Sequence, residues 1–326
     1  MNRLTAYIRL MRPHQYYKNV LIFIGIVFGE KLDQIDLYIP VMIGFCLLCC
    51  ISSTSYIIND IRDLENDRIH PEKASRPLPS GLVSSTAAFV FACLLFIVGI
   101  GGALVIDTYF LERNVPLFTL SLLAIFVTSQ IYNLVLKDVI FADVSAIALN
   151  YVFRAVSGCY LVEVAVSPWL IIIGYLFALF LALCKRKGDL LYLGVEKAAE
   201  HKRVFQAYST DLLDQATSIV ASSLIFSYAI YTFIDVDIEN KTLDVSSRAG
   251  IMIATIPLVA FAVLRYLYLL NNEGKIARKT EMIFFDRQLL LAGIIVVLLL
   301  IVATYQPDWL EIFSPLPQEG LVICLP

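Results

Sequence analysis

The sequence has few charged residues for its length, and this shortage excludes most classes of soluble protein. Only 16% of the 326 residues are charged, whereas 59% are hydrophobic. A composition of this kind is typical of a chain embedded in lipid. The formal net charge is -3, and the sequence has no basic tail, so nucleic acid is not an expected partner.

Other features that would indicate function are also missing. The N-terminal segment MNRLTAYIRLMRP has no apolar signal-peptide core and no small-residue cleavage site, so we expect no processing. The three histidines show no ligand or triad spacing, which argues against covalent nucleophilic catalysis. Among seven cysteines the one close set is Cys46, Cys49 and Cys50, and no second pair completes a zinc site. We interpret these cysteines as small hydrophobic residues.

Long apolar runs are what the sequence has in abundance. Nine of them are long enough to cross a hydrocarbon layer of ~30 Å. They cover approximately 14–30, 37–58, 82–106, 116–136, 139–162, 168–184, 216–235, 248–270 and 288–305. We therefore predict an all-α membrane protein with about nine transmembrane helices, forming a single domain over residues 1–326.

The positive charges are unevenly distributed between the two sides of this predicted topology. If the spans alternate, 19 of the 25 lysines and arginines fall on one side, four on the other and two within spans. The positive-inside rule makes the first side cytoplasmic, together with the N-terminus, and the predicted location is the cell membrane. The two longest connections, about 59–81 and 185–215, lie on this side, so we expect the active site there.

A run of acidic residues follows the second span directly. If its helix continues, spacings of three and four place Asn59, Asp63 and Asp67 on one face, with Asp60 beside them. Hard oxygen ligands of this kind suit Mg²⁺, with Mn²⁺ as an alternative, shared with substrate phosphates. Bases that would neutralise phosphate interleave with these acids: Arg62, Arg68, Lys73 and Arg76. The alternative is a solvated helix end with ordinary surface charges.

Here the sequence resembles a known family. NDIRDLENDR resembles the first aspartate-rich motif of the UbiA superfamily of intramembrane prenyltransferases, and the predicted helices resemble its fold. Further segments are most similar to the branch called decaprenyl-phosphate phosphoribosyltransferase: RPHQYYKN at 12–19, HPEKASRPLPSG at 70–81, YNLVLKDVIFADV at 132–144, FRAVSG at 153–158, and KRKGDLLYL with HKRVFQAY within 185–208. The resemblance covers roughly residues 9–210. It implies a UbiA-like bundle with a cytoplasm-facing cavity lined by Tyr132, Lys137 and Asp143.

The connection after the sixth span departs from typical prenyltransferases, which carry a second acidic cluster there. In this chain Asp189, Glu196 and Glu200 are scattered among bases that include Lys185 and Arg186. An excess of bases favours a substrate with more phosphate than a prenyl diphosphate. Alternatively, these bases obey the positive-inside rule and contact anionic lipid head groups.

Polar residues also recur within the fifth span. Asp143, Asn150, Arg154 and Ser157 lie along one helical face, where burial in hydrocarbon is costly unless they line a cavity or find partners. Arg154 lies far from the cytoplasmic connections, and a structural pairing with Glu163 or a helix end is an equally good interpretation.

The predicted reaction is Mg²⁺-dependent transfer of a 5-phosphoribosyl group from phosphoribosyl diphosphate to a polyprenyl phosphate, with release of diphosphate. We expect Asp63, Asp67 and Lys137 to act in catalysis. The expected substrate-binding residues are Lys18, Arg62, Arg68, Lys73, Arg76, Tyr132, Asp143, Lys185, Arg186 and Asp189.

Two other functions remain open at this point. A UbiA-type prenyltransferase would use the same first motif to ionise an allylic diphosphate for an aromatic or alcohol acceptor. A non-enzymatic transporter is a more remote alternative, because its polar groups would lie at mid-membrane on several helices. The sequence also leaves open whether the protein is a homo-oligomer.

Overall fold

The computed structural model describes residues 3–69, 73–194, 203–237, 242–245, 249–272, 286–305 and 323–324. Within these residues, seven helices are long and apolar enough to cross a membrane, and an eighth apolar helix, Arg287–Ala303, is shorter. The expected count of nine spans therefore remains a prediction. The chain divides into two compact units: unit 1 is Met1–Val135 with Phe153–Val164, and unit 2 is Leu136–Val152 with Ala165–Pro326.

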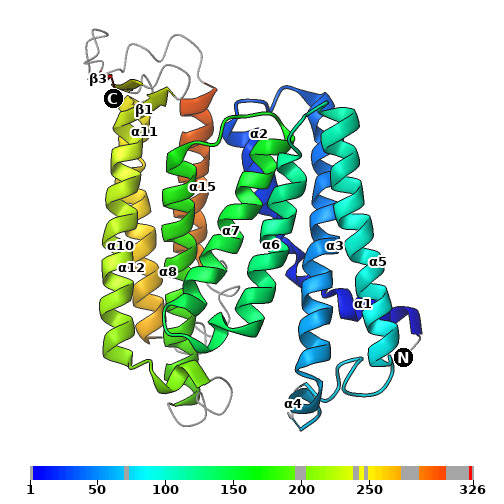
Figure 1. Ribbon diagram of the computed structural model, residues 1–326. Helices are drawn as coiled ribbons and strands as arrows, with labels where there is room; N and C mark the ends of the chain where they lie inside the picture. Colours follow the sequence, from blue (N-terminus) through cyan, green and yellow to red (C-terminus); the bar gives the residue numbers. More distant parts are fainter. Residues whose placement is uncertain are drawn as a thin grey trace. The chain divides into compact units, whose positions relative to one another are not determined.

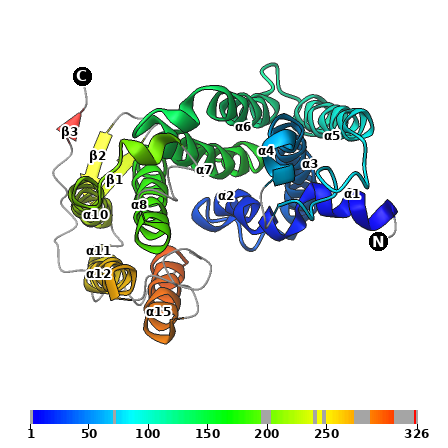
Figure 2. The same ribbon diagram turned by 90° about the horizontal axis from the view of Figure 1, so that it is seen from below.

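Unit 1 contains the N-terminal helices. Its elements are α1 (Arg3–Met11), the 3₁₀ helix η1 (Pro13–Phe23), α2 (Ile24–Phe28), η2 (Ile35–Leu37), α3 (Tyr38–Arg62), α4 (Leu64–Ile69), α5 (Ser85–Val105), the π-helical turn η3 (Ile106–Phe110) and α6 (Leu117–Leu134). Helices α3 and α5 pack side by side along their lengths (Figures 1 and 2). Fully buried side chains such as Leu48, Ile51, Phe118 and Leu122 fill the core of this unit.

The first predicted span is not a regular α-helix. Residues 13–23 form a 3₁₀ helix, and only the single turn of α2 that follows is α-helical. This segment packs against the C-terminal part of α7 (Ala142–Leu161), where a Cβ atom on Gly158 would lie 1.9 Å from the Ile22 carbonyl oxygen. A Cβ atom on Gly25 would in turn lie 2.5 Å from the Gly158 carbonyl group. The two backbones can therefore touch only because both positions are glycine.

Unit 2 contains the C-terminal helices. Its elements are η4 (Leu136–Asp138), the N-terminal part of α7, α8 (Pro168–Leu193), η5 (Arg203–Gln206), α10 (Thr210–Phe233), β1 (Ile234–Asp237), β2 (Thr242–Val245), α11 (Ala249–Ile253), α12 (Ile256–Asn272), α15 (Arg287–Thr304) and β3 (Ile323–Cys324). Helices α8 and α10 pack side by side, as do α12 and α15 (Figures 1 and 2).

Side chains cap several of these helices at their N-termini. Ser209 accepts the backbone N–H of Leu212 at 3.1 Å before α10, and Asp286 accepts that of Leu289 at 3.0 Å before α15. Such caps satisfy backbone donors that have no partner within the helix. The expected all-α class omitted one feature, because β1, β2 and β3 form a small antiparallel sheet in that order.

Candidate functional site

The acidic run lies at the C-terminal end of α3 and continues into α4. Helix α3 ends at Arg62, and Asp63 leaves the helical conformation with φ -88° and ψ 8°. The four-residue hydrogen bonding nevertheless continues, because the Asp63 N–H donates to the Asn59 carbonyl at 2.9 Å and the Asp67 N–H to the Asp63 carbonyl at 2.8 Å. The backbone hydrogen bonding that links these three residues therefore continues through a break in the helix.

The carboxylates of Asp60 and Asp67 are brought together by a shared arginine. The Nη1 nitrogen of Arg76 donates to Asp67 Oδ2 at 2.9 Å and to Asp60 Oδ1 at 3.4 Å. Lys73 Nζ lies 3.1 Å from the other Asp67 oxygen, and Arg12 donates through Nη2 to Asp60 Oδ1. Both acids are almost fully buried. We call these five side chains the Asp60–Asp67 cluster.

The local backbone conformation positions the three bases of this cluster. Arg12 stands between α1 and η1 in the left-handed region, with φ 55° and ψ 58°, a conformation that costs a non-glycine residue on the order of 1–3 kcal/mol. Its guanidinium lies 5.4 Å from the centroid of the Tyr56 ring, so the ion pair and a cation–π contact offset this cost. Lys73 and Arg76 lie in a turn, closed by the Arg76 N–H donating to the Lys73 carbonyl at 2.9 Å.

Sequence reasoning missed Arg12 and chose Lys18 instead. Both are basic residues at the start of the first apolar run, and their spacing alone does not distinguish them. Lys18 is half-buried, and its ammonium lies 5.7 Å from the Tyr17 ring centroid. Arg12 therefore belongs to the Asp60–Asp67 cluster, and Lys18 is not one of its five side chains.

The other predicted bases of this region lie at the surface. Arg62 is exposed at the end of α3, and Arg68 pairs with Glu65 at 2.8 Å, one turn away on α4. Exposed pairs of this kind contribute little to stability. The structure thus brings Lys73 and Arg76 to the buried carboxylates, and leaves Arg62 and Arg68 outside that cluster.

The donor atoms of the Asp60–Asp67 cluster fit a divalent metal that is shared with a ligand. Within the described part of the chain, no three acidic, cysteine or histidine side chains gather closely enough to form a metal site by themselves. Mg²⁺ typically binds one or two protein carboxylates, while water and substrate phosphates supply its remaining oxygen ligands. Asp60 and Asp67, which accept from the same nitrogen of Arg76, are two such carboxylates.

In unit 2, Asp143 is the centre of a second buried network. Its Oδ2 accepts from Arg186 Nε at 2.7 Å and its Oδ1 accepts from the Tyr208 hydroxyl at 2.7 Å. The Phe141 N–H donates to the same hydroxyl at 2.9 Å, and the Arg186 guanidinium lies 5.5 Å from the Phe205 ring centroid. Burial, together with the hydrogen bond to Asp143, raises the pKa of Tyr208 above its ordinary value. We call Asp143, Arg186 and Tyr208 the Asp143 cluster.

Three consecutive bases on α8 point in different directions. The predicted connection at 185–215 begins as helix, because α8 continues to Leu193. Lys185 is exposed, Arg186 pairs with Asp143, and Lys187 donates to Asp214 on α10 and Asn271 on α12. Asp189 is half-buried one turn after Lys185, whereas Glu196 and Glu200 lie outside the described residues. Arg186 and Lys187, two of these three consecutive bases, are therefore neutralised by the protein itself.

The polar residues of α7 are buried, as their common face predicts. Arg154 donates through Nε to Asn19 Oδ1 at 3.0 Å, and Ser52 donates to the same oxygen at 3.2 Å. Glu163, the alternative partner considered for Arg154, is instead paired with Arg113 at 3.4 Å. Arg154 thus has a structural partner on η1.

The remaining predicted cavity residues lie near the junction of α6 and α7. Tyr132 is in the last turn of α6, and Lys137 is in η4; both side chains are half-buried. Tyr132 and Lys137 each interact with other residues of the protein.

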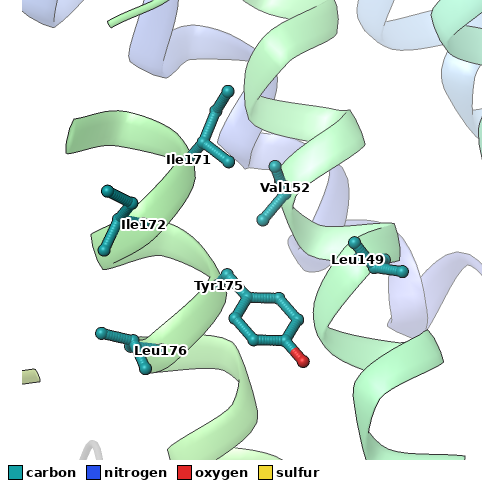
Figure 3. Close-up of a pocket in the computed structure, with 6 residues that line it drawn as sticks. All are labelled: Leu149, Val152, Ile171, Ile172, Tyr175 and Leu176. Carbon is teal, nitrogen blue, oxygen red and sulfur yellow. The ribbon is translucent and has the colours of Figure 1, made fainter. Parts of the chain in front are cut away.

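An apolar pocket of about 270 Å³ lies in unit 2. Leu149 and Val152 line it from α7, and side chains of α8 face them, among them Tyr175 with its hydroxyl at the edge (Figure 3). None of its six lining residues is charged, so the pocket suits hydrocarbon rather than phosphate.

Comparison with known proteins supplies independent information. The sequence model of the UbiA prenyltransferase family matches residues 20–196. The chain is 27% identical over 286 residues to the decaprenyl-phosphate phosphoribosyltransferase of Mycolicibacterium smegmatis, covering 86% of each sequence. It is 26% identical over 285 residues to the enzyme of that name from Mycobacterium tuberculosis, covering 86% of this chain and 87% of that one.

A solved structure shows a similar fold. It is a UbiA homolog from Archaeoglobus fulgidus bound to GPP and Mg²⁺, which superimposes with a TM-score of 0.64 at 18% identity. The match covers 92% of this chain and 98% of the other.

Proposed function

This chain belongs to the UbiA prenyltransferase family, and from that premise we propose that it transfers a 5-phosphoribosyl group from phosphoribosyl diphosphate to a polyprenyl phosphate. Diphosphate is the second product. Similarity to decaprenyl-phosphate phosphoribosyltransferases over most of both chains supports this choice among the reactions of the family. The proposal also takes the reaction to be Mg²⁺-dependent, as the divalent metal in the solved relative suggests.

One observation carries the proposal: buried carboxylates and bases converge in the Asp60–Asp67 cluster. A diphosphate bound with a divalent cation needs carboxylate oxygens for the cation and guanidinium or ammonium groups for the phosphate charge that is left. Arg76 and Lys73 contact the acids within hydrogen-bonding distance, so both kinds of group are held at one place. We propose Asn59 and Asp63 as further ligands of the same metal, and their side chains would have to join Asp60 and Asp67 when the cation binds.

In the proposed mechanism the protein stabilises a leaving group. Arg12, Lys73 and Arg76 take up negative charge that develops on the departing diphosphate as its bond to the anomeric carbon of the ribose lengthens. A bound Mg²⁺ would supply Lewis-acid polarisation of the same diphosphate. Lys18, Arg62 and Arg68 are candidates for the phosphate groups at the rim.

The acceptor needs little activation. A polyprenyl phosphate is already anionic at neutral pH, so its oxygen can attack the anomeric carbon without a dedicated general base, and the work of the protein is positioning. We assign Tyr132, Lys185 and Asp189 to substrate binding, and Lys137 to catalysis. Asp143 and Arg186 are committed to each other, so we assign them a positioning role for α8. The apolar pocket beside Tyr175 is one surface for hydrocarbon.

We also propose that the protein lies in the cell membrane and that the Asp60–Asp67 cluster is on its cytoplasmic side. In unit 1, the cluster contains Lys73 and Arg76, and two more bases, Arg62 and Arg68, lie near it in the sequence. Lys31, one of the few bases predicted for the opposite side, contacts the carbonyl of Val162 after α7. A concentration of bases at one end of a bundle is typical of the cytoplasmic side.

Prenyl transfer remains the second candidate, and one observation favours it. Arg186 and Lys187 are paired with acidic residues of the protein, so the bases of α8 neutralise less substrate phosphate than their number suggests. Under this alternative the Asp60–Asp67 cluster ionises an allylic diphosphate, such as the GPP bound in the solved relative.

The two candidates are separated by supplying each donor to detergent-purified protein with Mg²⁺. Phosphoribosyl diphosphate labelled in the ribose, with a polyprenyl phosphate, should give chloroform-soluble label. Label only from geranylgeranyl diphosphate, with aromatic or alcohol acceptors, would replace the first proposal by the second. Asp67→Asn should abolish the activity. The matched control is Glu65→Gln on the same short helix, where the side chain is 80% exposed.

A further inference from the structure

We propose that the Asp60–Asp67 cluster exchanges ion-pair partners when it binds ligand, so that a divalent cation and a diphosphate bind as one unit and each binds weakly alone. This inference rests on the proposed function only in taking a diphosphate as the ligand class. Arg12, which lies outside the aspartate-rich motif, is assigned a part in this exchange.

The charges of the cluster disfavour a free cation. Its contacts join three cationic side chains to two carboxylates, and each carboxylate already has two basic partners: Arg12 and Arg76 at Asp60, and Lys73 and Arg76 at Asp67. The acid side chains are only 5% and 3% exposed, so water does little to screen the charges around them. A divalent cation alone would have to displace bases that then have no anion to bind.

A free diphosphate meets the opposite difficulty. The three bases are more exposed than the acids, with 21% for Arg12, 35% for Arg76 and 39% for Lys73, so they form the accessible side of the cluster. An anion that draws these bases away leaves two buried carboxylates unpaired. Uncompensated buried charge is strongly unfavourable, so this binding is opposed as well.

Both difficulties disappear when the two ligands arrive together. Arg12, Lys73 and Arg76 turn from carboxylate to phosphate oxygens, and Asp60 and Asp67 become available to the cation. Each ligand then removes the cost that opposed the other, which is positive coupling and must be reciprocal. Coupling between two sites is typically about 5- to 150-fold, and we expect at least about tenfold here.

Arg12 gives this inference a signature that a scaffold residue would not produce. With Arg12→Gln, Asp60 loses one of the two bases that contact it in the described part of the chain, so the cation alone should bind more tightly, by about tenfold or more for one charge-assisted hydrogen bond. The same change removes a phosphate partner, so the cation should gain less from added diphosphate. A purely structural role would weaken both bindings together.

The experiment measures Mn²⁺ binding to the full-length, detergent-purified protein by electron paramagnetic resonance, without and with inorganic diphosphate, after correction for Mn²⁺–diphosphate complexes in solution. Inorganic diphosphate has no group to transfer, so no turnover is involved. Expected results are an increase in Mn²⁺ affinity of at least about tenfold on adding diphosphate, and the reciprocal increase in diphosphate affinity on adding Mn²⁺.

Variants complete the test. Arg9→Gln is the matched control, since it removes an exposed arginine three residues before Arg12, and it should keep the wild-type coupling. If Arg12→Gln does not fold, Arg12→Lys and the wild-type coupling still decide the matter, and Arg12→Lys should keep most of the coupling. Independent binding of Mn²⁺ and diphosphate would overturn this inference and leave the proposed function standing. Absence of binding even with both ligands present would overturn the two together.

Discussion

Arg186 and Asp143 form an ion pair of 2.7 Å in which the side chains are 4% and 0% exposed. The two residues come from α8 and α7, and the Tyr208 hydroxyl closes the network from the segment that follows η5. Three separate stretches of unit 2 are therefore fastened at one carboxylate.

Breaking this pair from one side should destabilise the protein severely. Arg186→Met leaves the Asp143 carboxylate buried, with Tyr208 as its one remaining side-chain partner among the described residues, and removal of one member of a buried pair typically costs about 3–5 kcal/mol. The measurement is the apparent Tm in detergent. The double variant Asp143→Leu with Arg186→Met should recover part of the loss, since no charge is then left unpaired. A single variant as stable as wild type would show that the pair is not formed.

Tyr208 should give this network a dependence on alkaline pH. Its pKa is raised in the folded protein by burial and by the hydrogen bond to Asp143, compared with an ordinary value of 10.0. The protonated hydroxyl therefore stabilises the fold fully below about pH 10, and this contribution is lost as the pH rises further toward the folded-state pKa. The difference in Tm between wild type and Tyr208→Phe should be largest near pH 8 and shrink above pH 10. Tyr109→Phe, at a side chain that is 79% exposed, is the control, and a difference that stays constant with pH would contradict the assignment.

Arg76→Lys should impair catalysis more than it impairs folding. A lysine keeps the charge but has no fork that can serve Asp60 and Asp67 together with a phosphate. We expect kcat/KM for phosphoribosyl diphosphate to fall by about 10- to 100-fold, equivalent to about 1.4–2.8 kcal/mol. Steady-state kinetics and the apparent Tm should be measured together. Arg9→Lys serves as the control, and unchanged kinetics in Arg76→Lys would remove the bridging arginine from the site.

Gly158→Ala should disrupt the packing of η1 on α7. The added methyl group would lie 1.9 Å from a backbone carbonyl oxygen, which cannot move aside as a flexible side chain can. We expect a loss of about 3 kcal/mol, at the upper end for overpacking. Gly101→Ala in α5 is the control, because a Cβ atom there meets nothing within 4 Å, and it should be neutral or slightly stabilising. Equal Tm values for the two variants would show that these backbones are not in contact.

Much of the fold was predictable, because hydropathy reports directly on which residues lie in lipid. The run at 116–136 is the helix Leu117–Leu134, and the run at 139–162 is Ala142–Leu161. The family resemblance based on NDIRDLENDR is confirmed by the match over residues 20–196. The 3₁₀ geometry of residues 13–23 was not predicted, because hydropathy indicates which residues lie in lipid and not which hydrogen-bonding pattern a helix adopts.

The candidate site was predictable only in its composition. The acids at 59–67 and the bases Lys73 and Arg76 could be named from spacing, but Arg12 lies 48 residues from Asp60, and no local pattern connects them. The sequence analysis also did not predict that Arg186 and Lys187 on α8 pair with acidic residues of the protein, and the reason there is different. Consecutive residues of a helix diverge by about 100°, so the bases at 185–187 would have been expected to point apart had the helix been extended beyond residue 184.

The position of Arg12 and Asp60 in the chain also has a consequence for biogenesis. The whole Asp60–Asp67 cluster is encoded within the first 76 residues, whereas the Asp143 cluster needs Tyr208. At a synthesis rate of about 5–20 residues per second, the ribosome takes roughly 7–26 s to pass from residue 76 to residue 208. The residues of the Asp60–Asp67 cluster are thus synthesised, and can begin to pair, well before those of the Asp143 cluster are complete.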